Sequence, residues 1–513
     1  SHFMAVTSGL SVPPDFHGST IASTGPRSAW ALSWPLGVGM VLFVCLMNAG
    51  GLPLLGDPDS HWHIAVGNWI LAHRSVPTVD TFSFTFAGQP WIAKEWLSQL
   101  LIAFAYNLGG WGGVTALAAA AIAASFALLL RLLLRDLTPL LAAMFTIAAI
   151  VMSASHFLAR PHVLAFPVML WWVAGLVRAV EERRAPEPFL LLAMLLWANL
   201  HGGFTLGLLL CGAFALDALT GARDAVERRA LFIGWVKFGS AAVLVACITP
   251  YGPESILVTL RIFGLGEALG VVSEWKAPDF QGQPMQELIL LVALYGVLSR
   301  GLKLPLIRLL IVIGFVHLYL RHARNAELLA MLVPLVIAPL LARQWPSLRP
   351  RPEATTEAGP FRRRMHELAR PAGHAVMTLC LALAGLYAAG MIAFAGISAP
   401  TSTMPAAALQ YALDNGRTGN VLNFYNYGGY LIRAGVPTFI DGRGELYGGD
   451  FIKRYAEAVN LRGDEPLERL IERHAIDWTL FPKDQPINKL LAHLPGWRRA
   501  YSDDASMIFV RDR

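Results

Sequence analysis

Residues 31–63 read ALSWPLGVGMVLFVCLMNAGGLPLLGDPDSHWH, an apolar run followed at once by two aspartates, two histidines and a tryptophan. The run at 31–53 is long enough to cross about 30 Å of hydrocarbon as a helix. Comparable apolar runs recur as far as residue 396 and then stop. The sequence therefore predicts a bundle of membrane-spanning helices that ends in a water-soluble region of about a hundred residues.

Composition excludes a soluble protein. Of the 513 residues, 55% are hydrophobic and 15% are charged, and the mean hydropathy of +0.50 is far above that of a soluble chain. The net charge of +6 could indicate nucleic acid, but Lys and Arg gather in short loops between apolar runs, where the positive-inside rule places them. We therefore expect no nucleic-acid partner. All four cysteines lie inside apolar runs, so no disulfide framework is predicted.

Candidate membrane spans lie at 31–53, 112–134, 138–155, 163–180, 187–200, 204–220, 230–249, 286–299, 305–320, 326–342 and 374–396. If all of them cross, the arginine-rich loops share one side, which should be cytoplasmic. The prediction is an α-helical polytopic membrane protein of about eleven spans with a small C-terminal α/β domain. Its parts are a cytoplasmic tail at 1–30, a transmembrane domain at 31–396 with external loops at 54–111 and 250–285, a cytoplasmic linker at 343–372, and an external domain at 397–513.

The external loop at 54–111 should carry two surface helices. Trp62, Val66 and Trp69 recur at helical spacing, so 59–73 is predicted to be an amphipathic helix lying at the membrane surface. A second helical pattern follows at 95–108. Asp57 or Asp59 could simply cap the first helix, and Glu95 could be no more than a favourable charge at the start of the second. The alternative for each is a reactive carboxylate beside the bilayer.

This layout resembles the GT-C superfamily of membrane glycosyltransferases, which take sugars from polyprenyl-phosphate carriers. Members place an acidic motif directly after the first transmembrane helix, in an external loop with two surface helices. Gly56-Asp57-Pro58-Asp59-Ser60-His61-Trp62-His63 matches in position and character. It is similar to the Asp-x-Asp-x-Tyr-Tyr-His version of some oligosaccharyltransferase catalytic subunits.

The tail carries a second, more distant likeness to oligosaccharyltransferases. NVLNFYNYGGY at 420–430, followed by Asp441-Gly442-Arg443, resembles their stretch containing Trp-Trp-Asp-Tyr-Gly and a downstream Asp. Phe424-Tyr425-Asn426 replaces Trp-Trp-Asp, the part that recognises a peptide acceptor, which argues against transfer to protein. The turn at 156–162 has His156 and Arg160-Pro161-His162 where a second Asp-x-Asp would stand.

The resemblance implies inverting glycosyl transfer at the external membrane face, which needs a carboxylate as base and a cationic site for the departing phosphate. Asp59 is the first candidate for the base and Asp57 the second, with His63 and Glu95 as further catalytic candidates. Candidate ligands of the donor phosphate are Arg160, His162, His201, Arg321, His322 and Arg324. Residues expected to contact the acceptor or the rest of the substrate are Glu274, Trp275, Tyr427, Asp441 and Arg443.

Structural roles are the alternative for several of these residues. The cluster at 321–325 could snorkel to lipid phosphates, and Asp441 could simply pair with Arg443. The segment around Glu274 could be a solvated loop rather than a lid. Asp57 and Asp59 could hold Mg²⁺ or Mn²⁺, although the missing second Asp-x-Asp favours no obligatory metal.

Short strands are predicted in the tail at 421–422, 430–432, 438–440, 478–481 and 507–510, with helices near 404–414, 450–460, 465–474 and 487–494. This alternation indicates a small α/β domain.

The sequence thus predicts a hexosyl- or pentosyltransferase of a bacterial inner membrane, with its C-terminal domain periplasmic or extracellular. Its expected partners are a polyprenyl-phosphate or pyrophosphate sugar donor, membrane lipids, and a lipid, glycan or polysaccharide acceptor. The alternatives are oligosaccharyltransferase-like transfer to protein, a non-catalytic scaffold, and a transporter or flippase. Scarce mid-span charges and the lack of an internal repeat disfavour the transporter.

Overall fold

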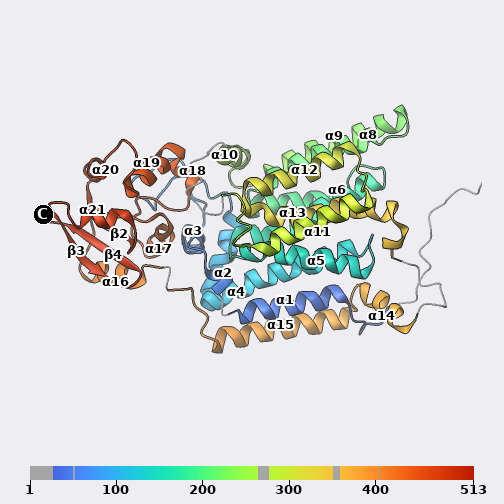
Figure 1. Cartoon of the computed structure of the whole chain (residues 1–513), viewed down its shortest axis with the longest axis horizontal. Coiled ribbons are helices and arrows are strands. Elements are labelled where there is room, and N and C mark those ends of the chain that lie inside the picture. Colours follow the sequence, from blue (N-terminus) through green and yellow to red (C-terminus); the bar gives the residue numbers. More distant parts are fainter. Residues whose placement is uncertain (1–26, 50–51, 264–275, 351–358, 402–403, 513) are drawn as a thin grey trace, which may run out of the picture.

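A computed structural model describes residues 27–49, 52–263, 276–350, 359–401 and 404–512. It has two parts, a long bundle of roughly parallel helices and a smaller α/β domain at one end of that bundle (Figure 1). Helices α3 and α10 lie where the two parts meet.

The bundle helices, in chain order, are α1 (Trp34–Asn48), α4 (Trp96–Leu133), α5 (Pro139–Ser153), α6 (Pro161–Glu181), α7 (Leu191–Leu200), α8 (Phe204–Thr220), α9 (Ala225–Ala246), α11 (Pro284–Arg300), α12 (Leu306–Arg321), α13 (Ala326–Gln344) and α15 (His374–Phe394). Shorter helices at its ends are α2 (Leu52–Leu55), α3 (Asp59–His73), α10 (Glu254–Phe263) and α14 (Pro360–Ala369). Several helices begin at a proline, because the N–H that proline lacks would have no partner in the first turn.

The chain is a multi-pass membrane protein. Within the described residues, six helices are long and apolar enough to cross a membrane: α4, α5 with the 3-10 turn that follows it, α6, α9, α13 with the 3-10 turn before it, and α15. Three shorter apolar helices lie at Trp34–Asn48, Pro188–Leu200 and Phe204–Thr220. Every predicted span coincides with a helix. Length and composition support only six crossings, however, so the predicted count of eleven is not confirmed.

Helix α4 contains both a loop helix and a span. The backbone leaves helical geometry at Gly109 and Gly110, with φ +57° at Gly110, so the segment before this kink diverges from the segment after it. A side chain at Gly113 would meet the Ala105 carbonyl oxygen at 2.1 Å, which explains the choice of glycine on the far side of the kink. The predicted helix at 95–108 and span at 112–134 are therefore one element bent at the glycines.

Helix α3 has the bounds predicted for the helix at 59–73, but its burial is not confined to one apolar face. Its polar face is covered as well, because α4 packs on one side and α17 (Gly428–Arg433) of the C-terminal domain packs on the other. His61 and His63 are consequently both buried. The approach of α4 is close: a Cβ at Gly67 would lie 2.2 Å from the Gln99 carbonyl oxygen.

The C-terminal domain has a four-stranded sheet in the order β1-β2-β4-β3, formed by β1 (Asn420–Asn423), β2 (Ile476–Pro482), β3 (Trp497–Ser502) and β4 (Ser506–Arg511). β1 pairs with β2 in parallel, and the other two pairs are antiparallel. Trp478 and Leu480 of β2 belong to one core and Phe481 to another, as the alternation of a strand requires. The surrounding helices are α16 (Ala406–Asp414), α17, α18 (Gly444–Tyr447), α19 (Gly449–Val459), α20 (Leu467–Arg473) and α21 (Pro486–Leu491).

Two of the predicted strands are wrong. The segment at 430–432 is part of helix α17, where Leu431 packs in one core and Ile432 against α3, so tertiary packing overrides the β-propensity of Tyr430 and Ile432. The segment at 438–440 forms only an isolated bridge, between Thr438 and Ser83. Strand β3 was not predicted, since its arginines interrupt the apolar pattern.

A buried ion cluster fastens the C-terminal domain to the loop between α3 and α4. The Arg443 guanidinium contacts both oxygens of Asp441 at 2.7 Å and Asp80 Oδ1 at 2.6 Å. The Arg443 and Asp441 side chains are 0% exposed. Buried carboxylates this close to a guanidinium stay ionised: burial alone would raise the pKa of Asp441, but Arg443 outweighs it and lowers that pKa. Tyr447 also donates a hydrogen bond to Asp441, at 2.6 Å.

Candidate active site

The two aspartates of the acidic motif converge on one arginine. Arg160 Nε lies 2.5 Å from Asp57 Oδ2, and its Nη2 pairs with Asp59 Oδ2. The Asp59 N–H donates to Asp57 Oδ1 at 3.1 Å, which fixes the two carboxylates relative to each other. The Asp57 side chain is 6% exposed and that of Asp59 19%, so neither points into bulk solvent.

Backbone contacts between two loops bring these groups together. The Ala159 N–H donates to the Leu54 carbonyl at 2.8 Å, and Ser60 Oγ donates to the Ala159 carbonyl at 3.1 Å. Arg160 has an extended backbone and is followed by Pro161, which starts α6. Its side chain therefore leaves the helix end toward the motif. Arg160 was predicted to bind a phosphate, whereas here it neutralises the acids.

The C-terminal domain lies directly over the acidic motif. A Cβ built on Gly442 would lie 2.2 Å from Asp59 Oδ1 and 3.0 Å from Trp62 Nε1. A Cβ on Gly429 would meet the Pro58 carbonyl oxygen at 2.6 Å. Only residues without a side chain allow this approach. Both glycines stand in the tail stretch whose resemblance was noted, although their contact with the motif could not be read from the sequence.

A second charged cluster lies beside the first. Lys94 Nζ is 3.2 Å from Glu445 Oε1 of α18, so this pair also joins the loop to the C-terminal domain. Burial alone would lower the pKa of Lys94, but Glu445 and Glu95 outweigh it and raise that pKa. Burial raises the pKa of Glu95, and Lys94 offsets this only in part. Sequence analysis did not assign Lys94 or Glu445 to the site. Lys94 stands next to Glu95 in the chain, but no motif marks Glu445.

Histidines form the rest of the wall. His201 Nε2 lies 3.5 Å from Glu95 Oε1, yet burial and the neighbouring His162 and Arg324 hold the pKa of His201 well below its ordinary value. The contact is therefore made by a neutral imidazole. His162 Nε2 lies 3.0 Å from the His156 carbonyl oxygen and 3.9 Å from Glu327 Oε1.

Glu327 is a buried carboxylate that sequence analysis missed. It begins α13 and also approaches His156 Nδ1, at 3.5 Å. The sequence carried a weak signal for it, since an acid at the start of an otherwise apolar span is expensive without a partner.

The charged groups described above lie near His63. Burial is the main cause of a pKa well below the ordinary value for this histidine, and the charges of Arg160 and Lys94 lower it further. Its Nδ1 lies 3.2 Å from Gln99 Nε2, and its ring lies 3.8 Å from that of Trp62. A neutral His63 can orient its neighbours, and its catalytic role stays a prediction.

The remaining predicted donor-site and lid residues differ in their positions. Arg324 is partly buried, and its charge acts on Lys94, Glu95 and His201, which places it at the site. Arg321 is exposed at the end of α12, and His322 is its partly buried neighbour. Glu274 and Trp275 lie outside the described residues.

The predicted acceptor residues of the C-terminal domain are buried. Tyr427 is buried and its hydroxyl lies 3.0 Å from Ser506 Oγ, while Asp441 and Arg443 have no exposed side-chain surface. Asp441 and Arg443 pair with each other, which is the alternative that the sequence left open. None of the three presents a free group to a substrate.

In the part of the chain that the structure describes, no three His, Cys, Asp or Glu side chains converge as metal ligands. Asp57 and Asp59 could supply oxygen ligands, and both already contact Arg160. Metal dependence stays a prediction.

Comparisons with known proteins identify the fold. No protein-family model matches the chain, and no curated protein matches it by sequence. The crystal structure of the apo oligosaccharyltransferase of Archaeoglobus fulgidus is similar, with a TM-score of 0.52, 12% identity, and coverage of 87% of this chain and 69% of that one. ArnT from Cupriavidus metallidurans bound to undecaprenyl phosphate gives a TM-score of 0.50 at 12% identity, with coverage of 92% of this chain and 97% of ArnT. A third match, with a TM-score of 0.51 at 11% identity, is A. fulgidus AglB in complex with an inhibitory peptide and a dolichol-phosphate.

The fold is that of a polytopic membrane protein, as in these solved structures. More particularly, the chain shares the GT-C fold of the ArnT and oligosaccharyltransferase structures, which is the fold that the resemblance of the acidic motif implied.

Proposed function

We propose that this protein transfers a sugar from a polyprenyl-phosphate carrier to an acceptor at the end of the bundle that carries the C-terminal domain. The observation that carries the proposal is the pairing of Asp57 and Asp59 with Arg160, directly after the first helix of a GT-C fold. The charges of Lys94, Arg324 and Arg160 all act on Glu95, so acids and cations that could serve acceptor and leaving group lie in one region.

In the proposed reaction an acceptor hydroxyl oxygen bonds to the anomeric carbon of the sugar while the bond from that carbon to the phosphate oxygen breaks. The electron pair of the broken bond stays with the phosphate. Asp59 accepts the hydroxyl proton. Asp57 fixes the position of Asp59 by accepting a hydrogen bond from the Asp59 N–H. Attack opposite the leaving group inverts the anomeric centre.

The departing phosphate needs cations, because its negative charge grows as the bond breaks. Lys94 and Arg324 are suited to this role: Lys94 is held protonated, and the charges of both residues act on the same carboxylate, Glu95. Arg160 can exchange one of its two carboxylates for a phosphate oxygen, since a guanidinium binds either in the same fork geometry. His201 supplies a neutral donor at the same wall, because its Nδ1 accepts from the Gly203 N–H and leaves Nε2 to donate.

The acceptor that fits best is a lipid, glycan or polysaccharide. Transfer to protein, as in the oligosaccharyltransferases of similar fold, is the second candidate. It is disfavoured because Phe424, where those enzymes have an acceptor-reading Trp, packs toward the domain core, with ring centroids 5.4 Å from Tyr427 and 6.3 Å from Phe481. A bacterial inner membrane with the C-terminal domain outside accords with the arginine-rich loops at the far end of the bundle.

The test is a transfer assay on protein reconstituted into liposomes with a panel of radiolabelled polyprenyl-phosphate hexoses and pentoses and a membrane glycolipid extract as acceptor. Release of the unlabelled polyprenyl phosphate measures turnover. Asp59→Asn should reduce turnover at least a hundredfold, whereas Asp464→Asn, an exposed acid of the C-terminal domain, should leave it unchanged. Full turnover by Asp59→Asn would remove the main support for the proposal.

A further inference from the structure

A hollow lies at the end of the bundle opposite the acidic motif. It has a volume of about 300 Å³ and is lined by Leu219, Ala225, Arg228, Arg229 and Phe232. Helix α8 begins next to His201 and runs 17 residues, about 25 Å, before it reaches this hollow. Figure 1 shows the turn between α8 and α9 at the end of the molecule far from the C-terminal domain. The hollow is thus separate from the candidate active site.

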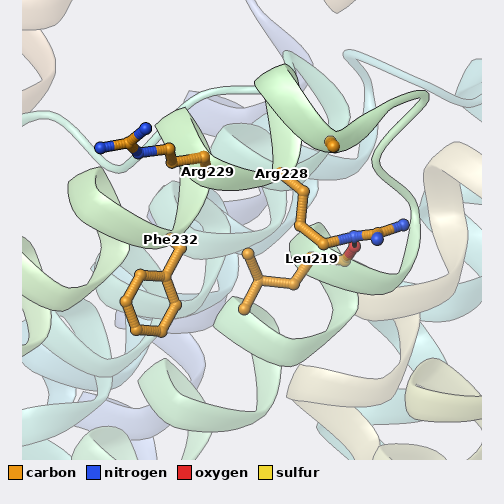
Figure 2. Close-up of a pocket in the computed structure, with 5 residues that line it drawn as sticks. Leu219, Arg228, Arg229 and Phe232 are labelled. Carbon is orange, nitrogen blue, oxygen red and sulfur yellow. Dashed lines mark hydrogen bonds between the residues drawn. The ribbon is translucent and has the colours of Figure 1, made fainter.

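The two arginines flank an apolar floor. Figure 2 shows Arg228 and Arg229 leaving one turn of α9 in opposite directions, with the Phe232 and Leu219 side chains below them. The Phe232 side chain is 54% exposed, although it lies inside a helix that is apolar enough to span a membrane. Val236, one turn further along the same face of α9, is exposed too. A charged rim with an apolar wall leading into the membrane fits an amphiphile.

Among the residues that the structure describes, no acidic side chain forms an ion pair with Arg228 or Arg229. Other arginines at this end of the bundle have acidic partners: Arg183 pairs with Glu227, and Arg308 pairs with Glu181 and Asp217. Of the two acids at the start of α9, Glu227 pairs with Arg183, and Asp224 caps the helix by accepting the Glu227 N–H. Among the described residues, Arg229 has no acidic side chain within ion-pair distance. Arg228 Nε donates a hydrogen bond to the Leu219 carbonyl oxygen at 3.4 Å.

We infer that this hollow is a binding site for an anionic glycerophospholipid. The lipid phosphate binds at the arginine rim, and an acyl chain runs along Phe232 and Val236. Basic recesses between membrane helices on the cytoplasmic side are suited to such headgroups, and the positive-inside rule assigns this end of the bundle to that side. A hollow of about 300 Å³ is at the small end for a ligand site, which fits a headgroup and not a whole lipid.

Native mass spectrometry of the full chain released from nanodiscs tests this inference. With discs of phosphatidylglycerol and phosphatidylcholine in equal parts, we expect one retained phosphatidylglycerol in the wild type and a loss of about fivefold in its occupancy for each arginine replaced, in R229Q and in R228Q/R229Q. Arg300→Gln is the matched control, since Arg300 is exposed at the end of α11 and does not line the hollow. Within the described part of the chain the Arg229 side chain makes no hydrogen bond or ion pair, so R229Q should fold even if the double variant does not.

Two further measurements ask whether the site binds a lipid phosphate or free phosphate, and whether Phe232 contributes to lipid binding. Inorganic phosphate at millimolar concentration should not displace the retained lipid, whereas Phe232→Ala should weaken retention. Equal retention of phosphatidylcholine, displacement by inorganic phosphate, or unchanged retention in R229Q would each overturn the lipid site.

Discussion

Replacing Arg443 by methionine should release the C-terminal domain from the bundle. Arg443 supplies three contacts of 2.6–2.7 Å to Asp80 and Asp441. Methionine would leave two carboxylates without their cation in a site with no exposed side-chain surface. Removing one partner of a buried ion pair costs about 3–5 kcal/mol.

The assay is hydrogen exchange in detergent, followed at two places. One is the loop around Asp80 and Ser83, which contacts the domain, and the other is strand β2 inside the domain. A loss of 3–5 kcal/mol corresponds to a fall of about two to three and a half orders of magnitude in amide protection. We expect that fall in the loop around Asp80, where docking is lost.

Two comparisons make the expected result specific. Arg498→Met removes an exposed ion pair with Asp512 and should change protection less than about fivefold. Adding Asp80→Asn and Asp441→Asn to Arg443→Met removes both stranded charges and should restore at least half of the lost stability. If Arg443→Met alone leaves protection near Asp80 within fivefold of the wild type, the buried ion cluster does not hold the domain in place.

Three further outcomes follow from the same contacts. Gly442→Ala should reduce sugar transfer at least tenfold while the domain stays folded by circular dichroism, because a Cβ would lie 2.2 Å from Asp59 Oδ1; normal turnover would show that the approach is not needed. Lys94→Gln should weaken undecaprenyl phosphate binding about tenfold in a fluorescence competition assay. Glu445→Gln should strengthen that binding, because it removes the carboxylate that competes for Lys94. Stronger binding by Lys94→Gln and weaker binding by Glu445→Gln would exclude Lys94 as a phosphate ligand. The pKa of Asp441 is lower in the folded protein than in the unfolded chain, where it is about 4, so its ion pair stabilises docking above that unfolded value and is lost as the pH falls through the folded one. Docking, followed by limited proteolysis, should therefore weaken only below about pH 4. Asp441→Asn should remove this loss of docking at low pH.

The sequence located the acidic motif because position alone marks it. Asp57 and Asp59 follow the first apolar run directly, and a pair of acids there stands out against hydrocarbon-compatible neighbours. The turn holding Arg160 was also identified, since charges at helix ends in a membrane protein are conspicuous. What could not be read was that Arg160 pairs with these acids, because the contact joins residues about a hundred positions apart in the chain.

The C-terminal contributions were the least predictable. Gly442 reaches the acidic motif, and Glu445 reaches Lys94, only because the buried Arg443 cluster docks the domain, and no local pattern encodes that docking. The strand predicted at 430–432 failed for the same reason, since contact with α3 stabilises a helix there. Local propensity describes the elements of this domain better than its contacts with the membrane bundle.

The most direct test of the proposed function is to locate the lipid carrier. Cryo-electron microscopy of the full chain in nanodiscs containing undecaprenyl phosphate should show the phosphate beside Asp59, in contact with Lys94, Arg160 or Arg324, and the polyprenyl chain leading from there into the membrane. Carrier density confined to other surfaces, with the acids still closed on Arg160 at saturating lipid, would contradict the proposed site.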